Sequence, residues 1–149
     1  MDIAFVEVPV VLDEDIDVVE YAHADDAGFD LRAHIEDEVV LWPGQRMAIS
    51  TGMRAAIPPG YELQVRSRSG LALKHGVIVA NSPGTVDAGY TGEIKVILAN
   101  IDELKPYTVK PNERIAQAVL APVARARLMP VDTLPQTARG EGGFGSTGR

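Results

Sequence analysis

Short hydrophobic runs recur along the chain about every ten residues, and turn-forming residues separate them. Several runs alternate hydrophobic and polar positions with a period of two, as strands with one buried face do. The runs cover residues 3–12, 29–33, 39–42, 46–50, 54–57, 61–65, 77–80, 93–100, 107–110 and 114–123. Many short strands with intervening turns are typical of sandwiches and barrels, so the pattern predicts an all-β fold.

One stretch departs from this pattern and predicts a short helix. It reads SGLALKHG and covers residues 69–76. Ser69 suits the N-cap position, the leucines, alanine and lysine favour helix, and Gly76 suits a helix end. Beyond Pro135 the hydrophobic pattern stops and a polar, glycine-rich segment begins. We therefore predict one domain over residues 1–134 and a flexible C-terminal arm over residues 135–149.

Composition and charge narrow the possible functions. The 149 residues are 46% hydrophobic, which is enough to bury the core of one domain. The net charge of −7 argues against binding to nucleic acid or to an anionic membrane, but it permits a small polyanionic ligand held by a few arginines. The absence of cysteine excludes disulfides and thiolate chemistry. An acidic N-terminus and the lack of a long apolar run predict a cytoplasmic protein.

Two stretches place polar side chains where a ligand could use them. DDAGFDLRA puts Asp30 inside a hydrophobic strand, and Gly28 beside it permits close approach of a backbone or a ligand. Alone, Asp30 is better explained as an outward-facing carboxylate. RSRSGLA puts Arg66 and Arg68 just before the predicted helix, where backbone N–H groups attract anions. A capped helix with surface arginines explains that stretch equally well.

Three further stretches carry polar residues on a turn, on a strand and in the arm. NSPGTVDAGYTGEIKV is rich in turn residues and predicts a hairpin that presents Asp87 and Tyr90. ERIAQAVL predicts a buried strand in which Arg114 and Gln117 are polar, with a structural ion pair as the simpler role of Arg114. RGEGGFGSTG lacks the residue order of a P-loop, although its glycines could free N–H groups to surround phosphates.

The histidines do not indicate a metal site. His23, His34 and His75 are scattered without the spacing of metal ligands, so we interpret them as surface residues.

Taken in order, five stretches resemble the five motifs of the homotrimeric dUTPases. They are AGFDL, RSRSGLA, NSPGTVDAGYTGE, RIAQ and RGEGGFGSTG, and together they extend from residue 27 to residue 148. Each motif is weak alone, whereas five in order form a specific signal. One position departs from the family: Thr91 stands where an arginine is usual, which removes a positive charge near the turn.

The resemblance implies a jelly-roll β domain that assembles as a homotrimer with active sites shared between subunits. The fifth motif would act as an arm that closes over a site. The implied reaction is hydrolysis of dUTP to dUMP and pyrophosphate, which keeps uracil out of DNA and supplies dUMP for thymidylate synthesis.

For the chemistry, the resemblance assigns Asp87 as the base that activates the attacking water. Ser69 would donate to the bridging oxygen that leaves, and Arg68 and Gln117 would hold phosphates. Mg²⁺ would be held mainly by the triphosphate, with Asp30 organising its hydration shell through water.

For recognition, the resemblance assigns Asn81 and the neighbouring backbone to uracil and Tyr90 to the deoxyribose. Phe144 would stack on the base, while Arg139, Ser146 and Thr147 would close on the γ-phosphate. The remaining expected substrate contacts are Gly70, Thr85, Val86, Lys95 and Gly145.

Two other functions remain open at this stage. A dCTP deaminase, alone or coupled to dUTP hydrolysis, shares the jelly-roll fold and needs a carboxylate near the pyrimidine amino group, for which Glu93 is a candidate by position. A non-catalytic trimeric binding module of the same fold is the second, although the joint presence of Asp30, Ser69, Asp87 and Phe144 argues against it.

Overall fold

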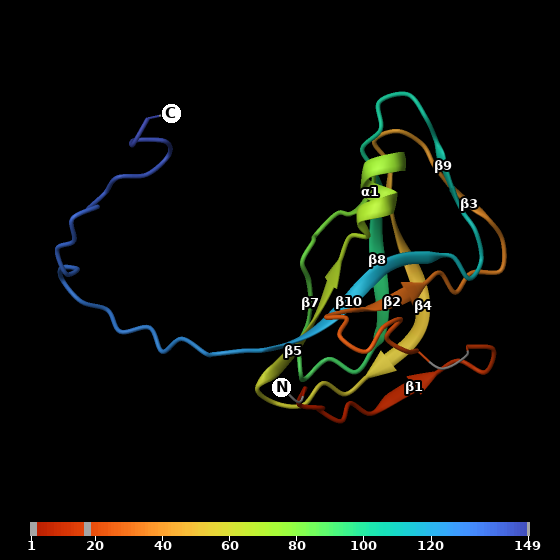
Figure 1. Cartoon of the computed structure of the whole chain (residues 1–149), viewed down its shortest axis with the longest axis horizontal. Helices are drawn as coiled ribbons and strands as arrows, with labels where there is room; N and C mark the ends of the chain where they lie inside the picture. Colours follow the sequence, from red (N-terminus) through yellow and green to blue (C-terminus); the bar gives the residue numbers. More distant parts are fainter. Residues whose placement is uncertain (1–2, 17–18, 149) are drawn as a thin grey trace.

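The computed structural model describes residues 3–16 and 19–148, and over these residues it contains ten strands and one short helix (Figure 1). The elements in chain order are β1 (Val10–Leu12), β2 (Phe29–Arg32), β3 (Val39–Leu41), β4 (Arg46–Ala55), β5 (Tyr61–Arg66), α1 (Ser69–His75), β6 (Val77–Val79), β7 (Gly84–Val86), β8 (Glu93–Asn100), β9 (Tyr107–Val109) and β10 (Arg114–Pro122). No helix in this part of the chain is long and apolar enough to cross a membrane.

Two antiparallel four-stranded sheets form the body, with strand orders β1-β4-β8-β6 and β2-β10-β5-β7, and a third pairing joins β3 to β9. The core lies between the large sheets. Ile94, Val96 and Leu98 project into it from β8, and Leu63 and Val65 project from β5. Alternate residues of both strands face outward, as a period of two requires. The predicted all-β, jelly-roll-like fold is confirmed.

Strand β4 is longer than the sequence pattern predicted. The runs 46–50 and 54–57 were expected as separate elements, but residues 46–55 form one strand with a register shift between Ser50 and Arg54. Gly52 makes the irregularity possible because its φ of +67° is a conformation that favours glycine. The opening run is shorter than predicted, since only Val10–Leu12 pairs with β4.

Two local predictions were wrong. The segment after β6 does not form a hairpin, because β6 pairs with β8 in one sheet whereas β7 pairs with β5 in the other. The chain therefore crosses between sheets at Asn81–Pro83. The helix is present, but its N-cap is Arg68, without a side-chain cap hydrogen bond, and Ser69 is the first helical residue. Gly76 ends the helix in a left-handed conformation as expected.

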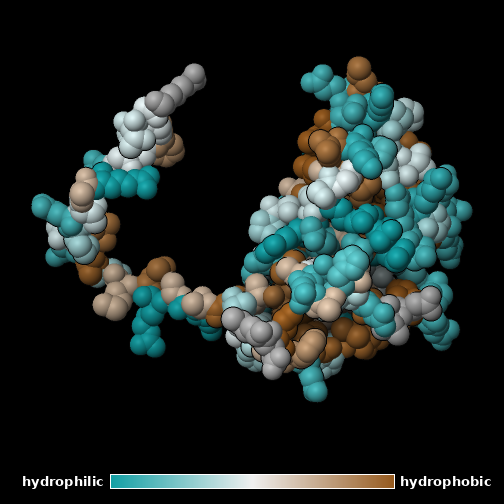
Figure 2. Space-filling view, viewed as in Figure 1, coloured by the Kyte–Doolittle hydropathy of each residue, from teal (hydrophilic) through white to brown (hydrophobic). Residues whose placement is uncertain are grey.

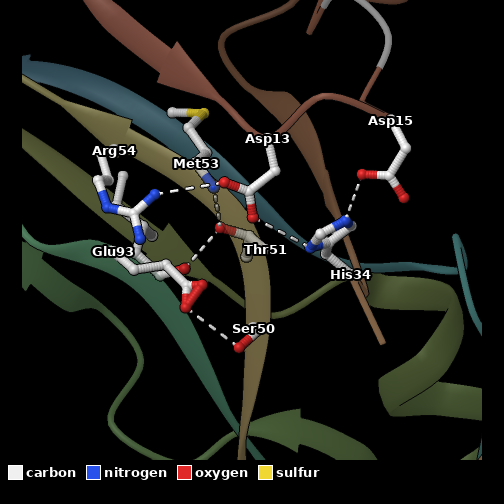
Figure 3. A network of polar contacts seen from close by, with 9 residues as sticks. Asp13, Asp15, His34, Ser50, Thr51, Met53, Arg54 and Glu93 are labelled. Carbon is white, nitrogen blue, oxygen red and sulfur yellow. Dashed lines mark hydrogen bonds and ion pairs between the residues drawn. The ribbon is translucent and has the colours of Figure 1, made fainter. Parts of the chain in front are cut away.

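A polar network ties the N-terminal segment to the body (Figure 3). His34 Nε2 lies 2.7 Å from Asp15 Oδ1, and its Nδ1 lies 3.4 Å from Asp13 Oδ2. Arg54 contacts the other oxygen of Asp13 at 3.4 Å. The hydrogen bond to His34 holds the pKa of the Asp15 carboxyl below its usual value. His34 is therefore half-buried and paired, whereas we had expected a surface residue.

The C-terminal segment leaves the body after β10 and extends away from it (Figure 1). Its last backbone contact with the body is the hydrogen bond from Val123 N to Gly60 O, at 2.9 Å. The segment carries hydrophobic as well as polar side chains on its surface (Figure 2). The exposed hydrophobic residues are Leu128, Met129, Val131, Leu134 and Phe144. The chain thus departs from the body before residue 135, where the predicted arm begins.

Replacing Asn100 should destabilise the fold. Its side chain, 1% exposed, donates at 2.9 Å to the carbonyls of Leu41 and Lys105 and accepts from Asp102 N at 2.9 Å. Asn100→Ala leaves these groups without the amide, so the free energy of unfolding should fall by about 2–4 kcal/mol in urea denaturation. Gln136→Ala, which removes an exposed amide, is the control. Equal stability of the two variants would contradict this role of Asn100.

Candidate active site

Five predicted site residues lie together around one pocket of about 310 Å³. They are Asp30, Arg68, Ser69, Gly70 and Gln117, which we call the pocket cluster. Asp30 comes from β2, Gln117 from β10, and the other three from the junction of β5 and α1. Antiparallel pairing places Gln117 opposite Asp30 on one side and opposite Arg66 on the other. Three motifs that are distant in the sequence therefore meet at one end of the sheet.

Two arginines form the cationic side of the pocket cluster, and Asp30 makes an ion pair with each of them. Its Oδ1 lies 3.1 Å from Arg68 Nε, and its Oδ2 lies 3.6 Å from Arg114 Nη1. Arg68 also donates through Nη1 to the Arg114 carbonyl at 3.2 Å. These contacts fix the Arg68 guanidinium through Nε and Nη1 and leave Nη2 out of both. An arginine held in this way is preorganised for an anion.

Ser69 is free for other chemistry because it does not cap the helix. It occupies the first helical position, is exposed, and lies on the rim of the pocket beside Gly70.

Gln117 and Ser67 fasten β10 to the β5–α1 junction. Gln117 Nε2 donates to the Ser67 carbonyl at 3.0 Å, and the Ser67 hydroxyl accepts from Val79 N at 2.8 Å. Gly28 permits this packing, because a Cβ there would lie 3.1 Å from Gln117 Oε1 and from Ala118 O. The sequence did not indicate the role of Ser67, since nothing local distinguishes it from Ser69.

A second group surrounds β7 at the other edge of the same sheet. It comprises Asn81, Thr85, Val86, Asp87 and Tyr90, which we call the β7 cluster. Asp87 is exposed directly after the strand, whereas Val86 is buried. Tyr90 donates to the Glu93 carbonyl at 2.8 Å, and its ring lies against Gly92, where a Cβ would meet the phenol oxygen at 2.6 Å.

The two clusters do not meet within one chain. Val86 pairs with Leu63, so Asp87 lies beside the beginning of β5, whereas Ser69 follows the end of β5. Leu63 to Arg66 alone covers about 10 Å of strand, and Ser69 lies further along. None of the β7 cluster lines the pocket. A carboxylate and a hydroxyl this far apart cannot act on the same phosphorus atom.

The other predicted residues lie apart from both clusters. Lys95 is exposed on the outer face of β8, in the other sheet. Arg139, Phe144, Gly145, Ser146 and Thr147 lie in the extended segment, where Phe144 is fully exposed with a φ of +51°. Arg139 Nε donates to the Gly142 carbonyl at 2.8 Å, one of several local turns in that segment.

Glu93, the candidate deaminase carboxylate, accepts a hydrogen bond from the Ser50 hydroxyl at 3.1 Å and lies opposite Arg54 in the β4–β8 pair (Figure 3). It lines neither the pocket nor the larger cavity of about 710 Å³ on the other side of Asp30. Its contacts are those of a structural residue.

The carboxylates present suit a metal ion only indirectly. Residues 3–16 and 19–148 contain no group of three or more His, Asp or Glu side chains that could hold one. Asp26 and Asp30 are the two carboxylates that line the pocket, and both oxygens of Asp30 face arginines. Such a donor set fits a hydrated Mg²⁺ carried by a phosphate ligand, touched through water.

A polar pair behind the pocket cluster was not predicted from the sequence. The Tyr107 hydroxyl donates to Glu113 Oε1, and Lys110 N donates to Glu113 Oε2 at 3.0 Å. Burial and the hydrogen bond to Glu113 raise the pKa of Tyr107 well above its usual value. Tyr107 and Glu113 lie six residues apart on either side of the β9–β10 turn, just before the RIAQ stretch, and neither belongs to one of the five motif stretches.

Comparison with known proteins identifies close relatives. The sequence model of the family described as dUTPase matches residues 14–148. The deoxyuridine 5'-triphosphate nucleotidohydrolase of Chlamydia caviae is 54% identical over 140 residues, covering 92% of this chain and 95% of the relative. The enzyme of the same name from Fusobacterium nucleatum is 46% identical over 144 residues, covering 97% and 98%.

Solved structures of dUTPases also resemble this chain in fold. The dUTPase of Staphylococcus bacteriophage 80alpha with dUpNHpp has a TM-score of 0.85 and 29% identity, with coverage of 96% of this chain and 99% of that chain. A dUTPase variant from phage phi11 of S. aureus, described with the coordination of a structural Mg(II) ion, has a TM-score of 0.74 and 25% identity, with coverage of 85% and 97%.

Gly28 should be required for the packing of the pocket, whereas Gly70 should not. Gly28→Ala brings a Cβ against Gln117 and against the β10 backbone, so the free energy of unfolding should fall by about 1–3 kcal/mol. Gly70→Ala meets nothing within 4 Å and lies in a helix, so stability should be equal or higher. Urea denaturation of both variants at one protein concentration tests this, and a stability loss confined to Gly70→Ala would refute it.

Proposed function

The chain belongs to the dUTPase family and hydrolyses dUTP to dUMP and pyrophosphate, and we propose that neighbouring copies of the chain complete each of its active sites. This activity keeps uracil out of DNA and supplies dUMP for thymidylate synthesis. We further propose a homotrimer as the assembly and the cytoplasm as its location.

The distance between the pocket cluster and the β7 cluster carries the proposal of shared sites. Asp87 lies beside the beginning of β5 and Ser69 lies beyond its end, although the proposed reaction needs both at one phosphorus atom. A second copy resolves this if its β7 cluster faces the first copy's pocket cluster. A closed ring of three copies then makes three equivalent sites with no unused half.

Asp87 is the proposed general base. It takes a proton from water as the water oxygen forms a bond to the α-phosphorus and the bond to the bridging oxygen breaks. Pyrophosphate leaves with that electron pair. The exposed position of Asp87 after β7 lets it reach a ligand on a neighbouring copy without burying an unpaired charge.

The pocket cluster is the proposed phosphate site. Negative charge grows on the leaving pyrophosphate, so preorganised donors stabilise the transition state more than the bound substrate. Ser69, whose hydroxyl is not used for capping, donates to the bridging oxygen. Arg68 presents its remaining N–H groups to the phosphates, and Gln117 and the backbone of Gly70 add neutral donors.

Magnesium is the proposed cofactor, in keeping with the Mg(II) described for the phage phi11 relative. When bound to the triphosphate, Mg²⁺ would neutralise part of its charge. Asp30 would orient the hydration shell through water while it keeps Arg68 and Arg114 in place.

The β7 cluster is the proposed nucleoside site. Asn81, Thr85 and Val86 would present amide and backbone groups to the uracil edge. The Tyr90 ring is held by its hydrogen bond to the Glu93 carbonyl and would contact deoxyribose, where a 2′-hydroxyl would clash. We also propose that Lys95 contacts the substrate. It faces away from both clusters within one chain, so this contact requires a neighbouring copy or a rearrangement.

The extended segment supplies the proposed lid. Fifteen residues separate Val123 from Arg139, enough to span about 50 Å when extended, so the fifth motif can reach another copy. Phe144 would stack on the base, and Arg139, Gly145, Ser146 and Thr147 would close on the γ-phosphate. That contact exists only with a triphosphate, which favours opening after hydrolysis.

Complementation between two inactive variants should test the shared site. Asp87→Asn removes the base, which should slow turnover by about 10²–10⁴-fold while the variant still binds dUpNHpp. Arg68→Ala disables the phosphate site. When the two are unfolded and refolded together in equal amounts, a random trimer should form intact sites at about a quarter of the wild-type number.

Pyrophosphate release from dUTP is the measurement, and each variant refolded alone is the control. Mixtures with no more activity than either variant alone would contradict shared sites without affecting the assigned reaction. Parallel assays with dCTP, dTTP and UTP test the preference for dUTP. Ammonia release from dCTP tests the deaminase alternative.

Truncation after Ala138 should leave the fold intact and lower kcat/KM for dUTP by at least about 100-fold, because Phe144 stacking alone is worth about 1–3 kcal/mol. Phe144→Ala should give a smaller loss of the same kind. Phe5→Ala, which removes another exposed phenylalanine outside the segment, is the matched control and should not change kcat/KM. Full activity of the truncated chain would mean that the segment is not a lid.

A further inference from the structure

A second carboxylate lies next to the cationic side of the pocket cluster. Glu113 directly precedes Arg114, whose carbonyl accepts from Arg68 Nη1 at 3.2 Å and whose guanidinium contacts Asp30. A free carboxylate at this position could pair with Arg68 in place of a phosphate. Because arginine binds carboxylate and phosphate with the same planar donors, such pairing would compete with the substrate.

The structure keeps the Glu113 carboxylate occupied elsewhere. Its Oε1 accepts from the Tyr107 hydroxyl and its Oε2 accepts from Lys110 N at 3.0 Å. The Glu113 backbone is fixed as well, since its carbonyl accepts from Ala33 N at 2.8 Å. Both carboxylate oxygens are thus used on the side of β9 and the β9–β10 turn.

Tyr107 is itself held in position. It pairs with Leu41 in the β3–β9 ladder, and its ring packs against His75 at the end of α1 with centroids 4.9 Å apart. Arg68 is anchored next to Glu113, because its Nη1 donates at 3.2 Å to the carbonyl of Arg114, the residue that follows Glu113.

We propose that Tyr107 is a positioning residue that holds the Glu113 carboxylate away from Arg68, so that the guanidinium stays available for the triphosphate. This rests on the proposed role of Arg68 in phosphate binding. Tyr107 does not touch the substrate and acts only through Glu113. Without its hydroxyl, Glu113 keeps one backbone hydrogen bond and is free to turn toward Arg68.

Tyr107→Phe and Glu113→Gln, alone and combined, test the proposal through KM and kcat for dUTP. Tyr107→Phe keeps the ring packing on His75, so the fold should persist, and KM should rise about three- to fivefold, as expected for a competing ion pair at a partly exposed arginine. The kcat should stay within about twofold, because bound triphosphate displaces Glu113. In the double variant the competing charge is absent, so KM should return to within about twofold of wild type.

The outcomes separate positioning from a structural role. Tyr61→Phe removes a hydroxyl from another partly buried tyrosine packed on the core, and it should leave KM unchanged. An unchanged KM in Tyr107→Phe, or a raised KM that persists in the double variant, overturns the proposal. The Arg68→Ala variant tests separately whether Arg68 binds phosphate at all. A normal KM in that variant refutes the proposed role of Arg68, whereas a raised KM leaves the outcomes above as the test of Tyr107.

Discussion

The pairing of β10 with β2 on one side and β5 on the other is the constraint on which the rest of the site depends. This register sets Gln117 opposite both Asp30 and Arg66, and it brings Arg114 within reach of Asp30. The chain then passes from β5 directly into α1, so Arg68 and Ser69 arrive at the same end of the sheet. A slip of one residue in β10 would turn Gln117 into the core and Ala118 out of it.

The local arrangement of charges explains how an acidic protein could bind a triphosphate. The net charge of −7 would repel a triphosphate, yet Arg68 and Arg114 lie together around the Asp30 carboxylate at one end of one sheet. Asp30 orients Arg68 and Arg114 and compensates them while the site is empty. Glu113 would add a second negative charge at the same place, and its bonds to Tyr107 and Lys110 direct it elsewhere. Local arrangement therefore outweighs the overall sign of the charge.

The proposed division of the site between copies follows from the separation of its two clusters. The pocket cluster, the proposed phosphate site, lies at one end of the sheet β2-β10-β5-β7, whereas Asp87, the proposed general base, follows β7 at an edge of that sheet. In the proposed assembly a second copy would provide the missing half, and the base would stay exposed until a substrate arrives. The extended segment is the proposed lid of the same arrangement, and its turns and glycines make few contacts with its own body. Ordering it would cost on the order of 1 kcal/mol per residue, so the proposed closure depends on contacts that a triphosphate would supply.

The sequence alone determined the fold class, the strands from β2 onward except β7, the short helix, and the identity of the polar residues in each motif. These features depend on hydrophobic periodicity, turn residues and motif order, all of which are local or linear. It did not determine that residues 46–55 form one strand, because the left-handed conformation of Gly52 is imposed by the packing around it. The expected hairpin after β6 was also wrong, since strand partners are chosen by the whole sandwich and not by the turn. Only the tertiary structure placed Asp30, Arg68 and Gln117 in one pocket and set Asp87 at a distance from them. Contacts between residues far apart in sequence arise from strand register and burial, which no short segment encodes by itself.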